Sequence, residues 1–295
     1  MKKVSYYKQI NNENTKQIIN WQDYDLSDSL FYSYRSTLYN SYTFPSRLHY
    51  HDYFELVILE EGNIDYICES TCVHPKNGDI LLISPGMFHM SKIRCEETLY
   101  KRHVFYLYPD AFDTLDCGTL VSFLKDASKG LTVFSIPDKN RPLFFSLLHQ
   151  FSRALEQKPN PNYLALAKGL LLQIFFYIGQ SNSTFVDHGT TLPKNILDIK
   201  HYIEQNFIEI SSVKEVADHF FYSREYVSRL FRQYFNTTVS NYIKARRIAY
   251  SQKLIEQGHS ISEACYQSGF ENMSTYIRTF RNVSGITPSE YRKQT

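Results

Sequence analysis

Residues 212–236, SVKEVADHFFYSREYVSRLFRQYFN, contain two short helical patterns separated by a tight turn. Ser212 precedes the first pattern and Ser223 precedes the second, and serine favours this position because its side chain accepts a backbone N–H. Apolar residues recur at helical spacing in both, so each helix has one face that packs inward. Two short helices joined by a tight turn form a helix-turn-helix.

Residues 260–285, SISEACYQSGFENMSTYIRTFRNVSG, repeat this organisation. Gly269 is expected to form the turn, and the second helix of this copy is expected to begin near Asn272. Three pairs have the spacing of a capping box: Ser212 and Glu215, Ser260 and Glu263, and Thr287 and Glu290. Three residues that tolerate positive φ stand where helices should end: Asn236, Gly258 and Gly285.

The segment between the two motifs, Val239–Gln257, predicts one helix of 19 residues. At a rise of 1.5 Å per residue this helix would be about 28 Å long. One turn of DNA is about 34 Å, and the second helix of a helix-turn-helix enters the major groove. The sequence therefore predicts that one chain presents two recognition helices to successive major-groove faces of a duplex.

The outward positions of the two recognition helices are the candidate DNA-binding residues. They are Arg224, Glu225, Ser228, Arg229 and Arg232 on the first, and Met273, Ser274, Ile277, Arg278 and Arg281 on the second. Arg229 and Arg278 are expected to contact base edges, because a guanidinium can pair with guanine through two hydrogen bonds. Arg232, Arg281, Arg246 and Arg247 are expected to contact phosphates or form internal ion pairs.

The last hundred residues resemble the AraC/XylS family of transcription regulators, over about residues 194–295. The motifs that carry the resemblance are Ser228-Arg229-Leu230-Phe231, Ile261-x-Glu263-Ala264, Arg278-x-Phe280-Arg281 and Gly285-x-Thr287-Pro288-x-x-Tyr291-Arg292. The resemblance implies an all-α domain of seven helices that binds promoter DNA and contacts RNA polymerase.

The residues before 194 have a different pattern, with short strands as well as helices, and they predict a second domain. The fold class expected for the whole chain is therefore α+β. Short strands such as Phe54–Leu59 and Asp79–Ile83 favour an antiparallel, cupin-like barrel over about residues 30–108. Apolar residues at helical spacing predict helices over about residues 140–180 that pack on the barrel or on a second copy of the chain. We therefore expect a sensing and dimerisation domain at 1–180, a linker at 181–193 and the DNA-binding domain at 194–295.

Composition bounds the class of protein. Charged residues make up 21% and apolar residues 43%, which is typical of a folded chain. Five cysteines and no secretory leader favour the cytoplasm, and no apolar run reaches the roughly 20 residues of a membrane span. Residues 194–295 carry 14 Lys and Arg against 10 Asp and Glu, which weakly favours an anionic partner.

The barrel region contains His49-x-His51-x3-Glu55, followed later by His89, which resembles a cupin motif. These four side chains could bind a divalent metal. We favour a small-molecule site without metal, because regulators of the resembled family carry such patterns with no metal. The candidate ligand-binding residues are His49, His51, Glu55, His89, Arg102, His103 and Tyr106. Arg102 and His103 are adjacent on a strand and face opposite sides, so only one can point inward.

These patterns together predict a homodimeric, non-enzymatic transcription regulator with no cofactor, whose barrel senses a small molecule, with a sugar suggested by family analogy alone. Two alternatives remain. One is a metal-dependent cupin enzyme fused to a DNA-binding module. The other is a regulator whose barrel only dimerises and binds no effector.

Overall fold

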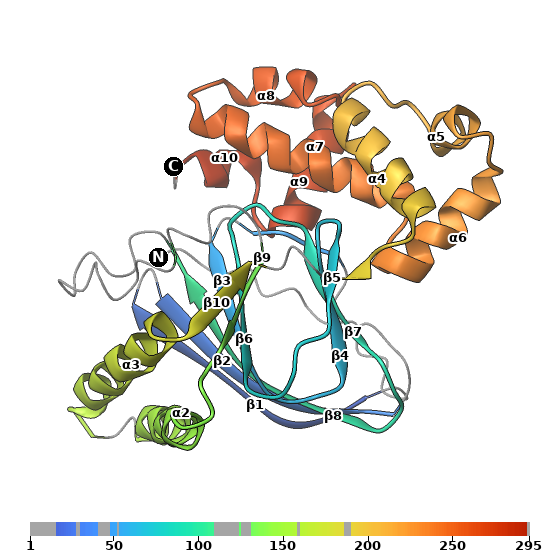
Figure 1. Cartoon of the computed structure of the whole chain (residues 1–295). Helices are drawn as coiled ribbons and strands as arrows, with labels where there is room; N and C mark the ends of the chain where they lie inside the picture. Colours follow the sequence, from blue (N-terminus) through green and yellow to red (C-terminus); the bar gives the residue numbers. More distant parts are fainter. Residues whose placement is uncertain are drawn as a thin grey trace. The chain divides into compact units, whose positions relative to one another are not determined.

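The computed structural model describes residues 16–27, 30–40, 48–51, 53–108, 124, 131–157, 160–185 and 190–293. By backbone contacts the chain separates into two compact units (Figure 1). The main segments of the first are Ile10–Ser46 and Tyr50–Thr190, and the second is mainly Thr191–Thr295. The division falls within the segment 181–193 that the sequence predicts as a linker. Within that segment, Asn182–Phe185 form a strand, β10.

The first unit is built from antiparallel strands arranged in two sheets that face each other (Figure 1). The larger sheet has the order β1-β2-β8-β3-β6-β9-β10 and the smaller β11-β5-β4-β7. The strands other than β10 are β1 (Lys16–Ser27), β2 (Leu30–Tyr39), β3 (Phe54–Glu61), β4 (Ile64–Cys68), β5 (Thr71–Val73), β6 (Asp79–Ile83), β7 (His89–Ile93), β8 (Thr98–Leu107), β9 (Leu131–Ser135) and β11 (Thr190–Thr191). The predicted antiparallel N-terminal domain is confirmed.

Two helices, α2 (Arg141–Glu156) and α3 (Tyr163–Gly179), cover the outer face of the larger sheet. Alternate residues of the strands, such as Leu56 and Ile58 of β3, join a single apolar cluster with the inner sides of both helices. Because side chains alternate across a strand, the intervening residues face the interior between the sheets. The helices thus fix the outer face and leave the inner face for the candidate ligand site.

The second unit contains seven helices within the described residues 190–293, which confirms the predicted number. They are α4 (Lys194–Asn206), α5 (Val213–His219), α6 (Arg224–Phe235), α7 (Val239–Glu256), α8 (Ile261–Gln267), α9 (Met273–Ser284) and α10 (Pro288–Arg292). α7 has 18 residues and is therefore about 27 Å long, close to the predicted length. Its buried side chains include Tyr242, Ile248 and Leu254, as the apolar pattern predicts.

The ends of these helices follow the local sequence. Capping boxes form at Ser260 with Glu263 and at Thr287 with Glu290, and Asn236 and Gly285 end helices with positive φ. The third predicted capping box is only half formed. Ser212 accepts from the backbone N–H of Glu215, but the Glu215 carboxylate accepts instead from the backbone and hydroxyl of Ser211. Ser211 offers that carboxylate two donors, which explains the difference.

Candidate functional site

The first helix-turn-helix consists of α5 and α6, and α6 is strongly two-sided. Val227, Leu230 and Phe231 are buried against the rest of the unit. The opposite side carries the predicted DNA-binding residues: Arg224, Glu225, Arg229 and Arg232 are exposed and Ser228 is half-buried. The guanidinium of Arg229 lies 5.4 Å from the ring centre of Tyr226, within the range of a cation–π interaction. This contact supports the Arg229 side chain on the outer face of α6.

The second helix-turn-helix consists of α8 and α9 and presents a different surface. Tyr276 and Phe280 of α9 are buried, as predicted. Ser274, Ile277, Arg278 and Arg281 are exposed, and they line an open hollow of about 640 Å³ together with Asn282 and Thr287.

Met273 does not belong to this exposed set. It is half-buried, and part of its side chain packs against the apolar cluster around Ile248 and Phe280. Met273 is the first residue of α9, and its role at the DNA surface stays a prediction.

Two arginines of α7 make internal contacts: Arg246 forms an ion pair, one of the two roles considered, whereas Arg247 bonds to backbone carbonyls instead. Arg247 donates from Nε to the carbonyl of Phe207 and from Nη2 to the carbonyls of Ile208 and Ile210. These carbonyls lie just after α4, where a helix leaves acceptors without intrahelical partners. Arg246 lies 3.8 Å from the Glu204 carboxylate of α4. α7 is therefore tied to α4 by charged groups.

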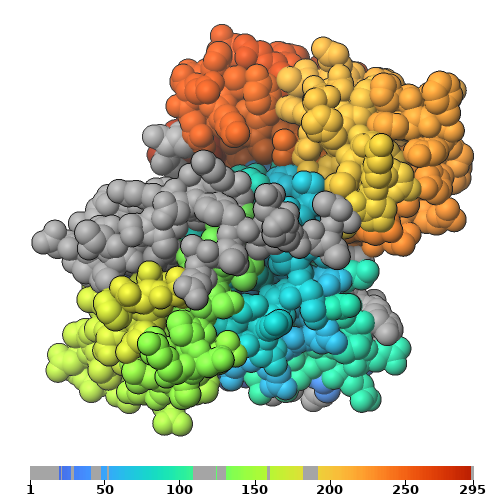
Figure 2. Space-filling model, in the orientation of Figure 1, coloured from blue at the N-terminus to red at the C-terminus, as the bar shows by residue number. Residues whose placement is uncertain are grey.

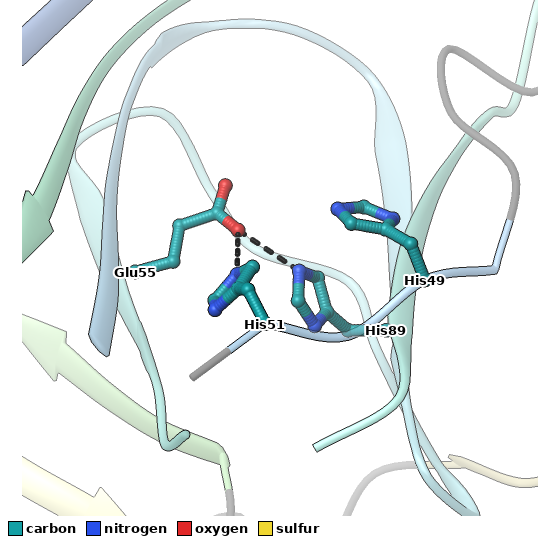
Figure 3. Close-up of side chains that lie close together, drawn as sticks. All are labelled: His49, His51, Glu55 and His89. Carbon is teal, nitrogen blue, oxygen red and sulfur yellow. Dashed lines mark hydrogen bonds and ion pairs between the residues drawn. The ribbon is translucent and has the colours of Figure 1, made fainter. Parts of the chain in front are cut away.

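The inner face of the barrel brings together most of the predicted ligand residues. Glu55 of β3 lies directly opposite Tyr106 of β8, and Leu59 lies opposite Arg102, so these side chains share one face. His89 of β7 reaches Glu55 from the smaller sheet, and its Nε2 lies 2.9 Å from Oε2 of Glu55. Nε2 of His51 lies 2.9 Å from the same oxygen. Figure 3 shows both rings directed at the carboxylate, with His49 beside them.

Each of these two histidines is held from its other side. Nδ1 of His51 is 2.8 Å from the carbonyl of Tyr53, and Nδ1 of His89 is 2.8 Å from the carbonyl of Met87. The Tyr53 ring stacks on His51 with centres 4.0 Å apart. All four donor atoms, including that of His49, lie within 4.8 Å of one another.

The electrostatics of the cluster favour an ionised carboxylate. Burial raises the pKa of Glu55, but His51 and His89 beside its Oε2 outweigh burial and leave that pKa well below its ordinary value. Burial lowers the pKa of His51, and the hydrogen bond to Glu55 only partly opposes this.

Arg102 is a further charged group of the inner face. It is 6% exposed, and its guanidinium carbon lies 4.1 Å from the ring centre of Tyr100. Within the described part of the chain, its buried Nη1 has no hydrogen-bond partner. A buried donor without an acceptor is costly, because it has lost water and gained nothing.

Comparison with known proteins follows the same division of the chain. The family model described as "AraC-like ligand binding domain" matches residues 33–175, and the model described as "Helix-turn-helix domain" matches residues 216–294. The multiple antibiotic resistance protein MarA of Salmonella typhimurium is 31% identical over 98 residues, covering 33% of this chain and 77% of MarA. The chain belongs to the AraC/XylS family of transcription regulators.

Two further AraC-family relatives match both domains. The HTH-type transcriptional activator RhaR of Mannheimia succiniciproducens is 23% identical over 269 residues, covering 85% of this chain and 88% of RhaR. The melibiose operon regulatory protein of Escherichia coli is 22% identical over 265 residues, covering 83% of each chain. Among solved structures, ToxT of Vibrio cholerae is 13% identical, covers 90% of this chain and 98% of its own, and has a TM-score of 0.37.

One predicted ligand residue of this AraC-family chain lies elsewhere. His103 faces α2 and not the barrel interior, because it alternates with Arg102 along β8. Its Nδ1 is 2.7 Å from the Tyr32 hydroxyl, which also bonds Ser152 of α2. Its Nε2 lies 3.3 Å from Glu60. His103 is therefore placed between the barrel and α2, and the prediction that it lies with the other ligand residues is wrong.

Two residues of the inner face were not predicted from the sequence. Arg35 of β2 lies directly opposite Arg102 and donates to the Tyr106 hydroxyl at 3.2 Å. Tyr53 supplies the stacking ring and the carbonyl for His51. The pairing of β2 with β8 depends on strand order, which the local sequence does not encode. The position of Tyr53, two residues after His51, could have been used to predict a stacking partner from the sequence.

No helix in the described part of the chain is long and apolar enough to cross a bilayer.

Proposed function

We propose that this AraC-family regulator binds promoter DNA through α6 and α9 and responds to a small polar effector, a sugar or a related metabolite, in its barrel. We propose further that it acts as a homodimer through α2 and α3 and contacts RNA polymerase when bound. The observation that carries the proposal is the presence of two helix-turn-helix motifs in one unit, each with arginines on the exposed side of its second helix.

The DNA-binding role of particular residues is supported by chemistry and exposure together. Arg229 and Arg278 stand on the exposed sides of α6 and α9, where a guanidinium can form two hydrogen bonds with guanine. Arg232 and Arg281 stand further along the same helices, where phosphate contacts are expected. Exposed Ile277 offers an apolar contact for the methyl group of thymine.

The effector site is supported by the inner face of the barrel. Tyrosine rings offer stacking surfaces, and the unpartnered Nη1 of Arg102 offers a buried donor to an oxygen of the effector. Ligand sites of this kind combine apolar walls with a few polar groups that fix orientation. A sugar has both the ring faces and the oxygens that such a site needs, and one relative takes its name from the melibiose operon.

The dimer is supported by an apolar surface on the outer sides of α2 and α3, which lie side by side and form a broad surface (yellow-green in Figure 2). Leu143, Leu166 and Phe176 are 48%, 52% and 48% exposed. Leu166, Gly169 and Phe176 are spaced so that they share one face of α3. Large exposed apolar side chains on neighbouring helices are typical of protein–protein contacts, and a second copy would bring an equal surface.

The regulatory mechanism that we propose is a shift of population. An effector that binds one arrangement of barrel and DNA-binding unit better than another changes which DNA half-sites a dimer occupies. The enzyme alternative has no support among the relatives, whose names describe regulators.

The experiment is selection of bound fragments from genomic DNA by the purified full-length chain, followed by a thermal-shift panel of sugars and small metabolites. We expect a recurrent bipartite site, and a stabilising compound whose effect is lost in Arg102→Gln. Failure of every compound would favour the ligand-independent dimeric regulator. For dimerisation, Leu166→Glu and Phe176→Glu should give monomers in light scattering, whereas Gln150→Glu on exposed α2 surface should not.

A further inference from the structure

The cluster of His51, Glu55 and His89 has an unusual arrangement of hydrogen-bonding atoms. One carboxylate oxygen, Oε2 of Glu55, lies 2.9 Å from Nε2 of both histidines. The other ring nitrogen of each histidine lies 2.8 Å from a backbone carbonyl. The histidine side chains are 8% and 0% exposed and the glutamate side chain is 11% exposed, so little water reaches them.

The positions of the protons follow from these contacts. A carbonyl oxygen only accepts, so Nδ1 of His51 and Nδ1 of His89 must each carry a hydrogen. A neutral imidazole has one N–H, and each Nε2 therefore presents a lone pair to Oε2 of Glu55. Three electron-rich atoms then converge on one point, an arrangement that requires positive charge between them.

The two histidine rings lie with their centres 4.8 Å apart at this shared oxygen. A single divalent cation would satisfy all three atoms at once and leave both imidazoles neutral.

The geometry fits a metal ion in two further respects. Ligand atoms about 2.1 Å from one ion lie about 3.0 to 3.4 Å from each other, and the two Nε2–Oε2 separations are close to that range. Histidines that bind metals usually donate their other N–H to a carbonyl or carboxylate, which fixes the ring and its tautomer. Tyr53 and Met87 supply these carbonyls.

We propose that the sensing barrel binds a divalent first-row transition-metal ion through Nε2 of His51, Nε2 of His89 and the carboxylate of Glu55. Two imidazoles with one carboxylate favour Zn²⁺, Fe²⁺, Co²⁺ or Ni²⁺ over Mg²⁺ and Ca²⁺, which prefer oxygen ligands. This site would hold a metal ion, whereas the proposed effector is an organic molecule. If the chain binds no metal, the proposed DNA-binding function is unaffected.

The test uses untagged full-length protein freed of metal by chelation. Zn²⁺ is titrated by calorimetry, and Co²⁺ is followed by its visible absorption, which reports the ligand atoms directly. We expect one ion per chain and a raised melting temperature. Glu55→Gln and His51→Gln should each weaken Zn²⁺ binding about 100-fold or more, since even groups that only orient a metal ligand are worth about 10- to 100-fold.

His74→Gln is the matched control, because His74 is an exposed histidine of the same unit and lies outside the cluster. It should bind Zn²⁺ as wild type does. Circular dichroism and binding to promoter DNA check that each variant is folded. The proposal is overturned if wild type binds neither Zn²⁺ nor Co²⁺, or if Glu55→Gln, folded, binds Zn²⁺ as tightly as wild type.

Discussion

The two helix-turn-helix motifs have the same backbone arrangement, but different interactions stabilise their turns. Each turn contains one residue with positive φ, Phe221 at 58° in the first and Gly269 at 86° in the second. Phe221 is 98% exposed, so its side chain gains little from packing. At Gly269 an added Cβ would lie 2.5 Å from the carbonyl oxygen of Ile208. The first turn is held by local geometry, whereas the second is also fixed by close packing against the segment after α4.

The exposed surfaces of the two recognition helices, α6 and α9, also differ. α6 presents three exposed arginines and Glu225, and it is suited to hydrogen bonds and charge. α9 presents Ile277 together with Arg278 and Arg281, and all three line an open hollow. The two recognition helices carry arginines at matching exposed positions, Arg229 with Arg278 and Arg232 with Arg281, but Ser228 of α6 corresponds to Ile277 of α9. We therefore expect the two helices to prefer different base sequences.

The largest effect is expected from Gly269→Ala, which tests the packing difference. Positive φ costs a residue with Cβ roughly 1–2 kcal/mol, and the clash with Ile208 adds to it, so we expect a loss of about 2–4 kcal/mol in the free energy of unfolding. Urea denaturation of the full chain measures it. Gly258→Ala is the control, because Gly258 has φ +91° with open space around it and should show the conformational cost alone. Equal losses at both positions would refute the packing argument.

The second prediction compares the two recognition helices. Arg229→Ala and Arg278→Ala should each weaken binding to the selected site by about 1–3 kcal/mol, because each loses contacts to a base edge. Each variant should also relax base preference in a different half of the site. Titration of labelled duplexes measures both, with Lys253→Ala on the exposed end of α7 as the control. If Arg229→Ala binds as wild type does, our assignment of α6 is wrong.

Arg232→Ala separates phosphate contact from base contact. It should weaken binding to all sequences alike, and the slope of log affinity against log salt should fall in magnitude by about 0.9, the value for one phosphate contact. Titrations at several salt concentrations on specific and random duplexes measure this. A loss confined to the specific site would instead place Arg232 at a base.

Phe221→Gly removes a side chain at the positive-φ residue of the first turn, whereas Gly269→Ala adds one at the second. Glycine removes the cost of positive φ but adds backbone freedom to the unfolded chain, so we expect a gain of only about 0.5–1 kcal/mol in the free energy of unfolding. Thermal and urea denaturation measure the gain. A marked loss would show that the exposed ring has a partner in solution.

The smallest effect concerns acid. Burial raises the pKa of Glu204, but Lys200, Arg246 and the hydroxyl of Tyr242 outweigh it and leave that pKa below its ordinary value. A lowered pKa contributes stability that is present above the unfolded value of about 4.3 and disappears as pH falls through the folded value. As pH falls below 5, the free energy of unfolding should therefore decrease less for Glu204→Gln than for wild type. Urea denaturation at several pH values measures this. Glu209→Gln, which changes an exposed carboxylate, should follow wild type, and a parallel decline in all three would contradict the sign.

The sequence predicts much of the DNA-binding unit because its determinants are local. Helix caps, apolar spacing and residues that tolerate positive φ lie within a few positions of the helices that they define. Helical position alone did not show that part of the Met273 side chain packs against the core.

The barrel is less predictable because strand pairing joins residues far apart in the chain. His51, Glu55 and His89 were found through their spacing, but the face of Arg102 and His103 and the proximity of Arg35 depend on the order β2-β8-β3. The carbonyls that orient the two histidines come from Tyr53 and Met87, and no side-chain pattern marks a carbonyl.

The most direct test of the account is a hydroxyl-radical footprint of the full-length chain on a duplex selected from a random pool. We expect two protected segments about one turn of DNA apart on one face of the duplex. We also expect Arg229→Ala to weaken one segment and Arg278→Ala the other. A single protected segment, or no preference for any duplex at low salt, would contradict the claim that α7 holds two recognition helices in register with DNA.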